Sequence, residues 1–286
     1  MIKVLKITGA ILLLVMVILY ILFYNFSAPK SDEKVLSAFI KLGQTPIIEH
    51  RSYKDYSYRV VSMQTRLDTS LPTLVFIHGS IGSVMDFKSY LTDTTLLSEF
   101  NMLVYDRIGY GKDHTGEVQE SIAFEVGLLH DLTDGIDPSN IVLAGYSYGA
   151  PVALASKRNY KGLIILAGAV YSEAEAIPWM INFYRWKMTR WMIPMTWKAA
   201  SKEKLSHADD LKKFEQEWNK HPSKIKVIHG EADWIVPFSN AEYLRNAFPK
   251  EQIEVFPIPD AGHALIWSQK DVIIQEILSG LRWFEQ

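Results

Sequence analysis

The chain has 286 residues, no cysteine, and a formal net charge of -2 from 30 basic and 32 acidic residues. The absence of cysteine excludes a disulfide-stapled scaffold and a cysteine-ligated zinc or iron–sulfur site. The 48% hydrophobic content excludes a disordered chain, and the near-neutral charge offers no cationic footprint for nucleic acid. We therefore expect an ordinary folded protein with no nucleic-acid partner.

An apolar segment near the amino terminus has the length of a membrane span. Residues 7–26 carry no charged side chain and would form a helix of about 30 Å, the thickness of a bilayer's hydrocarbon core. Lys3 and Lys6 precede it, which predicts a single-pass protein with a cytoplasmic amino terminus and an extracytoplasmic globular domain. A cleaved signal peptide is the alternative, but its apolar core is usually shorter. We assign residues 1–30 to a signal anchor with its tether and residues 31–286 to the globular domain.

Apolar runs alternate with amphipathic stretches along the rest of the chain. Unbroken apolar strands indicate burial on both faces, as in a parallel sheet covered by helices, and the alternation predicts an α/β domain. Functional groups in such sheets lie at the carboxyl ends of the strands. The predicted strands are residues 56–63, 73–77, 102–105, 141–144, 163–166, 225–228 and 253–258, and the clearest predicted helices are 121–136 and 241–248.

A glycine-flanked serine follows one of these strands. The sequence Gly145-Tyr146-Ser147-Tyr148-Gly149 is a G-x-S-x-G motif between a predicted strand and a helical stretch. A serine on so sharp a turn leaves no room for side chains at the flanking positions, and the turn projects its hydroxyl above the sheet. The motif taken alone also fits a turn of small residues without chemistry.

A candidate acid and a candidate base follow in chain order. A serine hydroxyl needs a base to become a nucleophile, and the base needs an orienting carboxylate. Asp233 and His263 each lie in a loop after a later predicted strand. The order of Ser147, Asp233 and His263, each at a strand's carboxyl end, resembles the α/β-hydrolase superfamily. The resemblance covers nearly all of residues 50–286.

The resemblance implies a serine-hydrolase mechanism on an α/β-hydrolase fold, a mostly parallel sheet flanked by helices. Ser147 would attack an acyl carbon while His263 takes its proton, and Asp233 would orient the imidazole. His78-Gly79-Ser80 looks like the family's oxyanion loop, in which the backbone N–H groups of Ser80 and Tyr148 would bind the developing oxyanion. The sequence DRIGYG at 106–111 is similar to a family turn that shapes the pocket wall.

Other titratable residues receive lesser roles. Asp260, Glu173 and Glu175 are alternative candidates for the triad acid. The remaining histidines show no ligand spacing, so we expect no metal and no cofactor. His78 and His229 each precede a glycine at a strand end, where loop packing is the expected role.

The segment 170–224 is far longer than one crossover connection requires, and the resemblance implies a helical cap inserted there. Residues 177–195 are rich in tryptophan and methionine, and we expect Trp179, Phe183 and Trp186 to line a substrate pocket.

Two helices are predicted in this segment. Pro194 should end the first, and a second should start near Ser206 and present Leu211, Phe214 and Trp218 on one face.

The cap also carries a local excess of positive charge. Between residues 176 and 204 six basic residues stand against one acid, Glu203, a local charge of +5. The aromatic side chains either pack the cap over the site, or part of this surface touches the membrane. The basic residues are Arg185, Lys187, Arg190, Lys198, Lys202 and Lys204.

These features predict a membrane-anchored serine hydrolase that cleaves lipophilic carboxylic esters through an acyl-enzyme on Ser147. Its expected partners are a small-molecule or lipid-like ester substrate and, through the amino-terminal helix, the membrane. An aminopeptidase resembling the proline iminopeptidases is an alternative, but it needs an acidic group in the cap to hold the substrate's ammonium. A non-catalytic binding protein on a hydrolase fold is a second alternative, disfavoured because the triad and oxyanion elements look intact. Other chemistries of the superfamily use the same triad.

Overall fold

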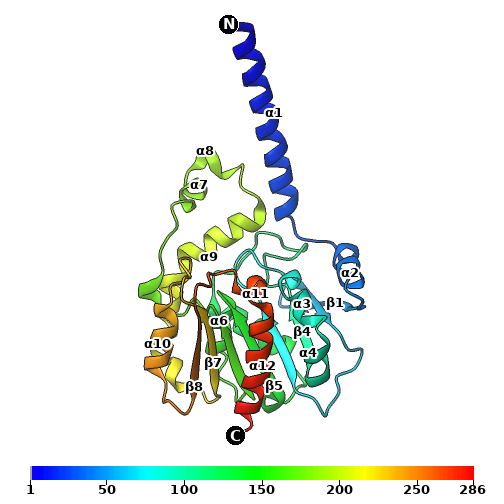
Figure 1. Cartoon of the computed structure of the whole chain (residues 1–286), viewed down its shortest axis with the longest axis vertical. Helices are drawn as coiled ribbons and strands as arrows, with labels where there is room; N and C mark the ends of the chain where they lie inside the picture. The colour runs from blue at the N-terminus through cyan, green and yellow to red at the C-terminus, as the bar shows by residue number, and fades with distance from the viewer. Residues whose placement is uncertain (1) are drawn as a thin grey trace.

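The computed structural model describes residues 2–286, which form one α/β domain from which a long amino-terminal helix projects (Figure 1). This helix, α1 (Ile2–Ser27), contains the apolar stretch Lys6–Ser27, whose mean hydropathy is 2.7 and none of which is buried. Among the described residues it is the one helix long and apolar enough to cross a membrane. By length and composition it fits a membrane anchor or a signal sequence.

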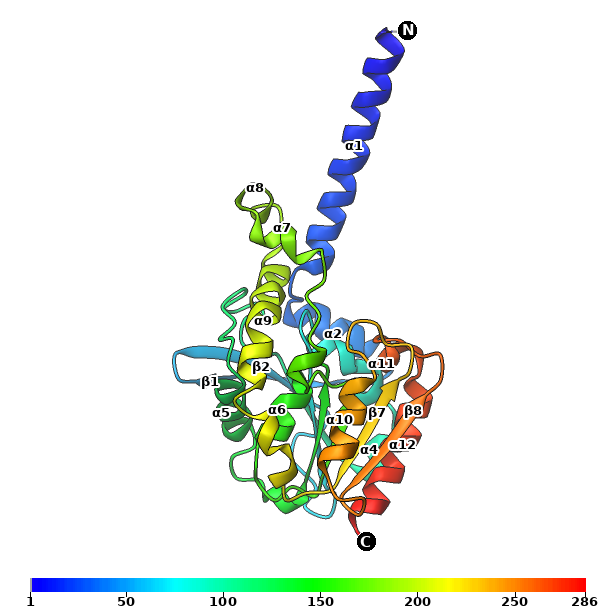
Figure 2. The same ribbon diagram turned by 90° about the vertical axis from the view of Figure 1, so that its left-hand side faces the viewer.

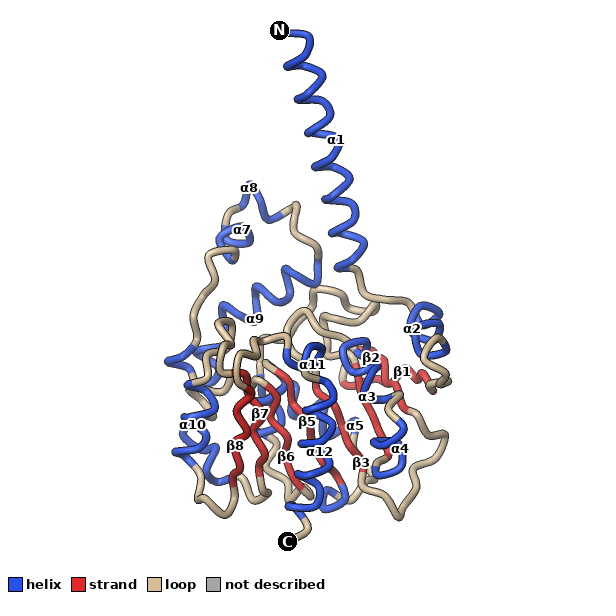
Figure 3. Tube along the Cα trace, viewed as in Figure 1, coloured by secondary structure: helices blue, strands red, loops and turns tan. Residues whose placement is uncertain are grey.

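An eight-stranded sheet forms the centre of the domain, in the order β1-β2-β4-β3-β5-β6-β7-β8 (Figure 3). The β1–β2 and β2–β4 pairs are antiparallel and all other neighbours are parallel. The strands are β1 (Ile47–Tyr53), β2 (Tyr56–Ser62), β3 (Thr73–Ile77), β4 (Asn101–Tyr105), β5 (Ile141–Tyr146), β6 (Gly162–Leu166), β7 (Ile225–Gly230) and β8 (Ile253–Ile258). The predicted fold class is thus confirmed.

Helices cover both faces of the sheet because its strands are apolar on both sides. In β3, Val75 and Ile77 pack into one core, and Leu74 and Phe76 into the other. The first core is covered by α5 (Ile122–Leu132), α6 (Gly149–Ala155) and α10 (Ser239–Ala247) (Figure 2). The second is covered by α2 (Asp32–Ile40), α3 (Lys88–Leu91), α4 (Thr94–Glu99), α11 (Leu265–Ser268) and α12 (Lys270–Phe284).

One strand has no counterpart among the predicted ones. The edge strand β1 pairs only with β2, and most of its residues are exposed. Its polar sequence, IIEHRSY, carries no long apolar run because only Ile48 and Tyr53, near its two ends, pack against the cores.

The segment between β6 and β7 forms three α-helices that lie beyond the carboxyl ends of the strands (Figure 1). Two are short, because an extended residue, Trp186, interrupts the tryptophan-rich stretch. The helices are α7 (Ile181–Arg185), α8 (Lys187–Arg190) and α9 (Met195–Leu211). We call residues 170–224 the cap segment.

The prediction of a helix starting near Ser206 is wrong. Pro194 stands at the N-cap of α9, which runs straight through Ser206. The start was misplaced because α9 buries polar side chains, among them Glu203 and His207, so its buried face does not show as an apolar pattern. The residues beyond α9 form a separate short 3-10 helix, Glu215–Lys220.

Candidate active site

Ser147 sits on the sharp turn between β5 and α6. Its φ of 53° lies in the left-handed region, a strained conformation for a residue with a side chain. The glycines on either side are required by space. A Cβ on Gly145 would lie 2.5 Å from the carbonyl oxygen of Gly149, and one on Gly149 would lie 2.2 Å from that of Ile77. The turn therefore has the close packing that the motif predicts.

The structure brings Ser147, His263 and Asp233 together from the ends of three strands. The Nε2 atom of His263 lies 3.1 Å from the Ser147 hydroxyl, and its Nδ1 atom lies 2.7 Å from Oδ2 of Asp233. The other carboxylate oxygen of Asp233 accepts the backbone N–H groups of Ile235 and Val236, each at 2.9 Å. This chain of hydrogen bonds can orient the imidazole and let it take a proton from the hydroxyl.

Tyr146 and His229 contact His263 and Asp233, a role that the sequence analysis did not assign to either residue. The hydroxyl of Tyr146 donates to the backbone carbonyl of His263 at 2.8 Å, and the two rings stack with centroids 5.2 Å apart. His229 lies 3.7 Å from Asp233 and donates to the carbonyl of Val236. Burial lowers the pKa of His229, so it stays neutral beside the acid.

The alternative acids have other surroundings. Glu173 accepts a hydrogen bond from Tyr171, and Glu175 forms an ion pair with Lys204. Asp260 is exposed on a turn with a positive φ of 57°. The carboxylate that contacts His263 is that of Asp233.

Ser80 and Tyr148 lie beside Ser147 on the wall of the same cavity. Throughout residues 2–286, no protein acceptor is found for the backbone N–H of either residue. Two free N–H groups next to a nucleophile are what an oxyanion hole requires.

A buried network that sequence reasoning missed connects these two residues to the cap segment. Glu203 of α9 accepts hydrogen bonds from the hydroxyls of Ser80 at 2.8 Å and Tyr110 at 2.5 Å. It also forms an ion pair with Arg107, whose guanidinium lies 4.2 Å from the centroid of the Tyr148 ring. One buried Arg–Glu pair thus contacts both candidate oxyanion residues.

The partner on the other side of Arg107 is Glu125 of α5, 3.3 Å from the guanidinium. Burial raises the pKa of Glu125 to about 7.

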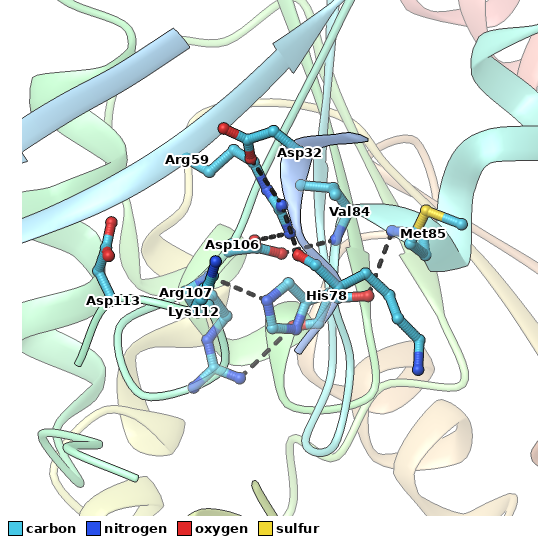
Figure 4. Close-up of polar contacts among 12 residues, drawn as sticks. Asp32, Arg59, His78, Val84, Met85, Asp106, Arg107, Lys112 and Asp113 are labelled. Atoms are coloured by element: carbon cyan, nitrogen blue, oxygen red, sulfur yellow. Dashed lines mark hydrogen bonds and ion pairs between the residues drawn. The ribbon is translucent and has the colours of Figure 1, made fainter. Parts of the chain in front are cut away.

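His78, at the start of the loop that carries Ser80, is fully buried. Figure 4 shows its side chain among the polar contacts that surround it. Its Nε2 atom accepts the backbone N–H of Arg107 at 2.9 Å, and its Nδ1 atom lies 2.7 Å from the carbonyl of Gly79. This pattern needs the neutral ring, and burial accordingly lowers the pKa of His78 to about 3. His78 thus has the packing role expected from the sequence.

The neighbouring Asp106, which begins the DRIGYG turn, ties the same loop to the amino-terminal tether (Figure 4). It accepts the backbone N–H of Val84 at 2.8 Å and pairs with Arg59 at 2.6 Å. Arg59 also pairs with Asp32 at 3.0 Å and donates to the carbonyl of Lys30. The base of the tether is therefore fixed to the domain by a buried arginine.

A largely apolar cavity of about 550 Å³ opens above Ser147 and His263. Of the three aromatic residues expected to line it, Trp179 and Phe183 do so. Trp186 lies outside the lining and is 58% exposed.

The lining also includes Tyr20 and Phe23 of α1, which sequence reasoning missed. Its polar side includes the Glu175–Lys204 pair and His207. No group of His, Asp and Glu side chains that could hold a metal ion occurs within the described part of the chain.

Several known proteins are similar to this chain. A protein of Acanthamoeba polyphaga mimivirus, named as an alpha/beta hydrolase, is 26% identical over 220 residues, which are 74% of this chain and 73% of the relative. A solved structure named as a lipase, from Acinetobacter baumannii, has a TM-score of 0.67 and 16% identity, and the match covers 90% of this chain and 97% of that one. A solved membrane phospholipase A has a TM-score of 0.61 and 14% identity, with 99% of both chains covered.

The family assignment rests on the sequence match over most of the globular part. Residues 74–276, well over half of the chain, match the family described as alpha/beta hydrolase. The fold of the domain is similar to that of the structural neighbours named above. The chain is a member of the alpha/beta hydrolase family.

Proposed function

We propose that the protein is a serine hydrolase that cleaves carboxylic esters with an apolar acyl or alkyl part. The observation that carries the proposal is the position of Ser147. Its hydroxyl lies 3.1 Å from His263, which is hydrogen-bonded to Asp233, on the wall of an apolar cavity of about 550 Å³. An activated hydroxyl beneath an apolar chamber suits a substrate that brings a carbonyl and a hydrocarbon part together.

In the proposed reaction the Ser147 oxygen attacks the ester carbonyl as its proton passes to Nε2 of His263. Asp233 stabilises the imidazolium that forms, and the N–H groups of Ser80 and Tyr148 bind the carbonyl oxygen as it gains negative charge. The protonated imidazole then gives its proton to the departing alcohol, which leaves an acyl-enzyme. Water, activated by the same histidine, releases the acid and restores the hydroxyl.

The substrate class is proposed from the lining of the cavity. Aromatic and aliphatic side chains from the cap segment and from α1 make up most of it, which favours a lipid-like ester. One structural neighbour, whose match covers 99% of this chain and so extends over α1, is a membrane phospholipase A, which supports the same class.

The aminopeptidase alternative needs a carboxylate free to hold an ammonium group. Of the two cap acids near the site, Glu175 is paired with Lys204, and Glu203 is buried against Arg107. Both are already neutralised by a cation, which supports the esterase.

We further propose that residues 1–30 anchor the enzyme, that the cap segment is an insertion in the domain 31–286, and that the catalytic domain lies outside the cytoplasm. The apolar α1 and the lysines that precede it support this arrangement.

A series of p-nitrophenyl esters of rising chain length, compared with proline anilides, tests the reaction. The full-length protein in mild detergent should hydrolyse the esters, with kcat/KM rising with chain length, and leave the anilides intact. Ser147→Ala and His263→Ala should each lower kcat by about 10⁴-fold or more, whereas Ser139→Ala, at an exposed serine, should change nothing. Unchanged ester hydrolysis by folded Ser147→Ala would refute the proposal.

A further inference from the structure

The last turns of α1 are in direct contact with the cap segment. The Tyr20 hydroxyl donates to the backbone carbonyl of Met192 at 3.0 Å, and the Phe23 ring packs on Trp197 with centroids 5.3 Å apart. At the end of the helix, the indole N–H of Trp197 donates to the Ser27 hydroxyl at 3.0 Å. The cap segment therefore runs along the side of α1.

The contact between Tyr20 and Met192 shows how far along α1 the cap segment extends. Ser27 is seven positions after Tyr20, which at 1.5 Å per residue is about 10 Å along the helix axis. The carbonyl of Met192 is thus about 10 Å inside the domain-proximal end of the apolar stretch. Both views show α7 and α8 beside the lower part of α1, farther from the sheet than α9 (Figures 1 and 2). If α1 spans a bilayer, α7 and α8 are inside its nearer leaflet.

The surface of this part, which we call the cap tip (residues 177–192), has the chemistry of a membrane-inserted element. Large apolar side chains point outward, a costly arrangement in water and a favourable one at a bilayer interface. The only charged side chains are Arg185, Lys187 and Arg190, cations that complement anionic headgroups. The most exposed apolar side chains are Trp179 at 71%, Trp186 at 58%, Met188 at 88% and Trp191 at 71%.

The cavity above the candidate site is continuous with this surface. Its lining includes Ser147 and His263, but also Tyr20, Phe23 and Met192, which lie at the contact between α1 and the cap segment. The apolar chamber therefore extends to the level of the proposed leaflet.

We propose that α1 and the cap tip form a substrate entrance inside the leaflet of a phospholipid bilayer, with Tyr20 and Phe23 as walls of the acyl-chain site. The helix α1 is then part of the substrate site as well as an anchor. An acyl chain passes from the leaflet to Ser147 without crossing water. This inference rests on the proposed function, since it assumes an ester substrate and a spanning α1.

One test measures how deep the cap tip lies in the bilayer. The chain has no native cysteine, so a single introduced cysteine can be labelled without a competing thiol. Full-length Met188→Cys, reconstituted in phosphatidylcholine–phosphatidylglycerol vesicles, carries a nitroxide label. The matched control is Lys213→Cys. The first turn of α9 contacts α1 through Thr196, whereas Lys213 lies just beyond the other end of α9. The label at position 188 should collide with oxygen and be shielded from a water-soluble nickel chelate, while the control should show the reverse. A water-exposed label at position 188 overturns the inference.

Chain-length selectivity is the second test. The double variant Tyr20→Ala/Phe23→Ala should lower the ratio of kcat/KM for a long-chain ester to that for an acetate ester by about tenfold, because two apolar walls are lost. The control Leu19→Ala/Leu22→Ala changes exposed residues of α1 outside the cavity lining and should keep the wild-type ratio. An unchanged ratio in the first variant refutes the role of α1. If the wild-type protein were inactive on every ester, the proposed function would be refuted. The label would still show whether position 188 lies inside the leaflet, so the two failures can be told apart.

Discussion

Glu203 reaches from the cap segment to both residues of the proposed oxyanion hole, through the Ser80 hydroxyl and through Arg107 stacked on Tyr148. We infer that it is a positioning residue, because it contacts the loop and not the reacting atoms. Its removal should let the loop move and so weaken stabilisation of the transition state.

Steady-state kinetics on a short ester test this role. Glu203→Ala should lower kcat by about tenfold to a hundredfold with little change in KM, and Glu203→Gln, which can still accept from Ser80, should recover part of it. Glu203→Ala also leaves Arg107 less well paired, so thermal unfolding is measured in parallel. Lower stability with an unchanged kcat would make Glu203 purely structural.

His221 provides a pH prediction at a site far from the chemistry. Its Nε2–H donates to the carbonyl of Ser156 at 3.1 Å, and its Nδ1 accepts the N–H of Ser223 at 3.1 Å. The second bond requires the neutral ring, because Nδ1 can accept a hydrogen bond only while it carries no proton, and burial lowers the pKa of His221 to about 4. The pKa of the histidine in the unfolded chain is 6.5. Between this pH and about 4, the unfolded chain is protonated at His221 and the folded chain is not. Stability should therefore fall as the pH drops from 6.5 to about 4, by roughly 3 kcal/mol.

Urea unfolding of the full-length protein in mild detergent measures this loss. The stability difference between wild type and His221→Gln should shrink as the pH falls through this window. A difference that stays constant would show that the ring is protonated equally in both states.

The sequence predicted the residues of the site whose signal is local. Ser147 between two glycines, and Asp233 and His263 after their strands, stand in recognisable contexts, and the structure brings these three side chains together. Glu203 left no such signal, because its partner Ser80 is 123 residues away and only the folded chain joins them.

Among the elements, the turn from β5 to α6 depends most strictly on residue size. A Cβ on Gly149 would meet the backbone of β3, which cannot move without disturbing the sheet. We expect Gly149→Ala to lower the free energy of unfolding by on the order of 3 kcal/mol. The control is Gly262→Ala, where the nearest atom to a Cβ would be the carbonyl of Ala232 at 3.9 Å. Thermal unfolding compares the two, and equal melting temperatures would contradict this account of the turn.

The strands of the sheet were predictable and the helices of the cap segment were not. The predicted strand 73–77 coincides with β3, because strands buried on both faces show as unbroken apolar runs. In the cap segment, α9 buries Glu203 and His207 through hydrogen bonds, while Trp186 and Met188 are exposed on the cap tip. Polar residues inside and apolar residues outside reverse the pattern on which sequence prediction relies.

At the scale of the whole molecule, the end of α1 and the tether that follows it are each fixed to the domain, in addition to the Tyr20–Met192 contact farther up the helix. Arg59 holds the tether through Asp32 and the carbonyl of Lys30, and Trp197 holds the end of α1 through Ser27. These contacts hold α1 at a set position relative to the site.

Protease protection tests the proposed orientation. A carboxy-terminal tag on the full-length protein should be digested in cells whose outer face is accessible to protease while the inner membrane is intact. An amino-terminal tag should be cut only after that membrane is opened. The reverse pattern would place the catalytic domain in the cytoplasm.

Covalent labelling by a fluorophosphonate tests the central claim, that Ser147 is a nucleophile activated by His263, most directly. The full-length protein should gain one adduct by intact mass, and peptide mapping should place it on Ser147. Ser147→Ala should gain none, and His263→Ala should react far more slowly. A folded wild-type protein that stays unmodified, or an adduct on another serine, would contradict the account.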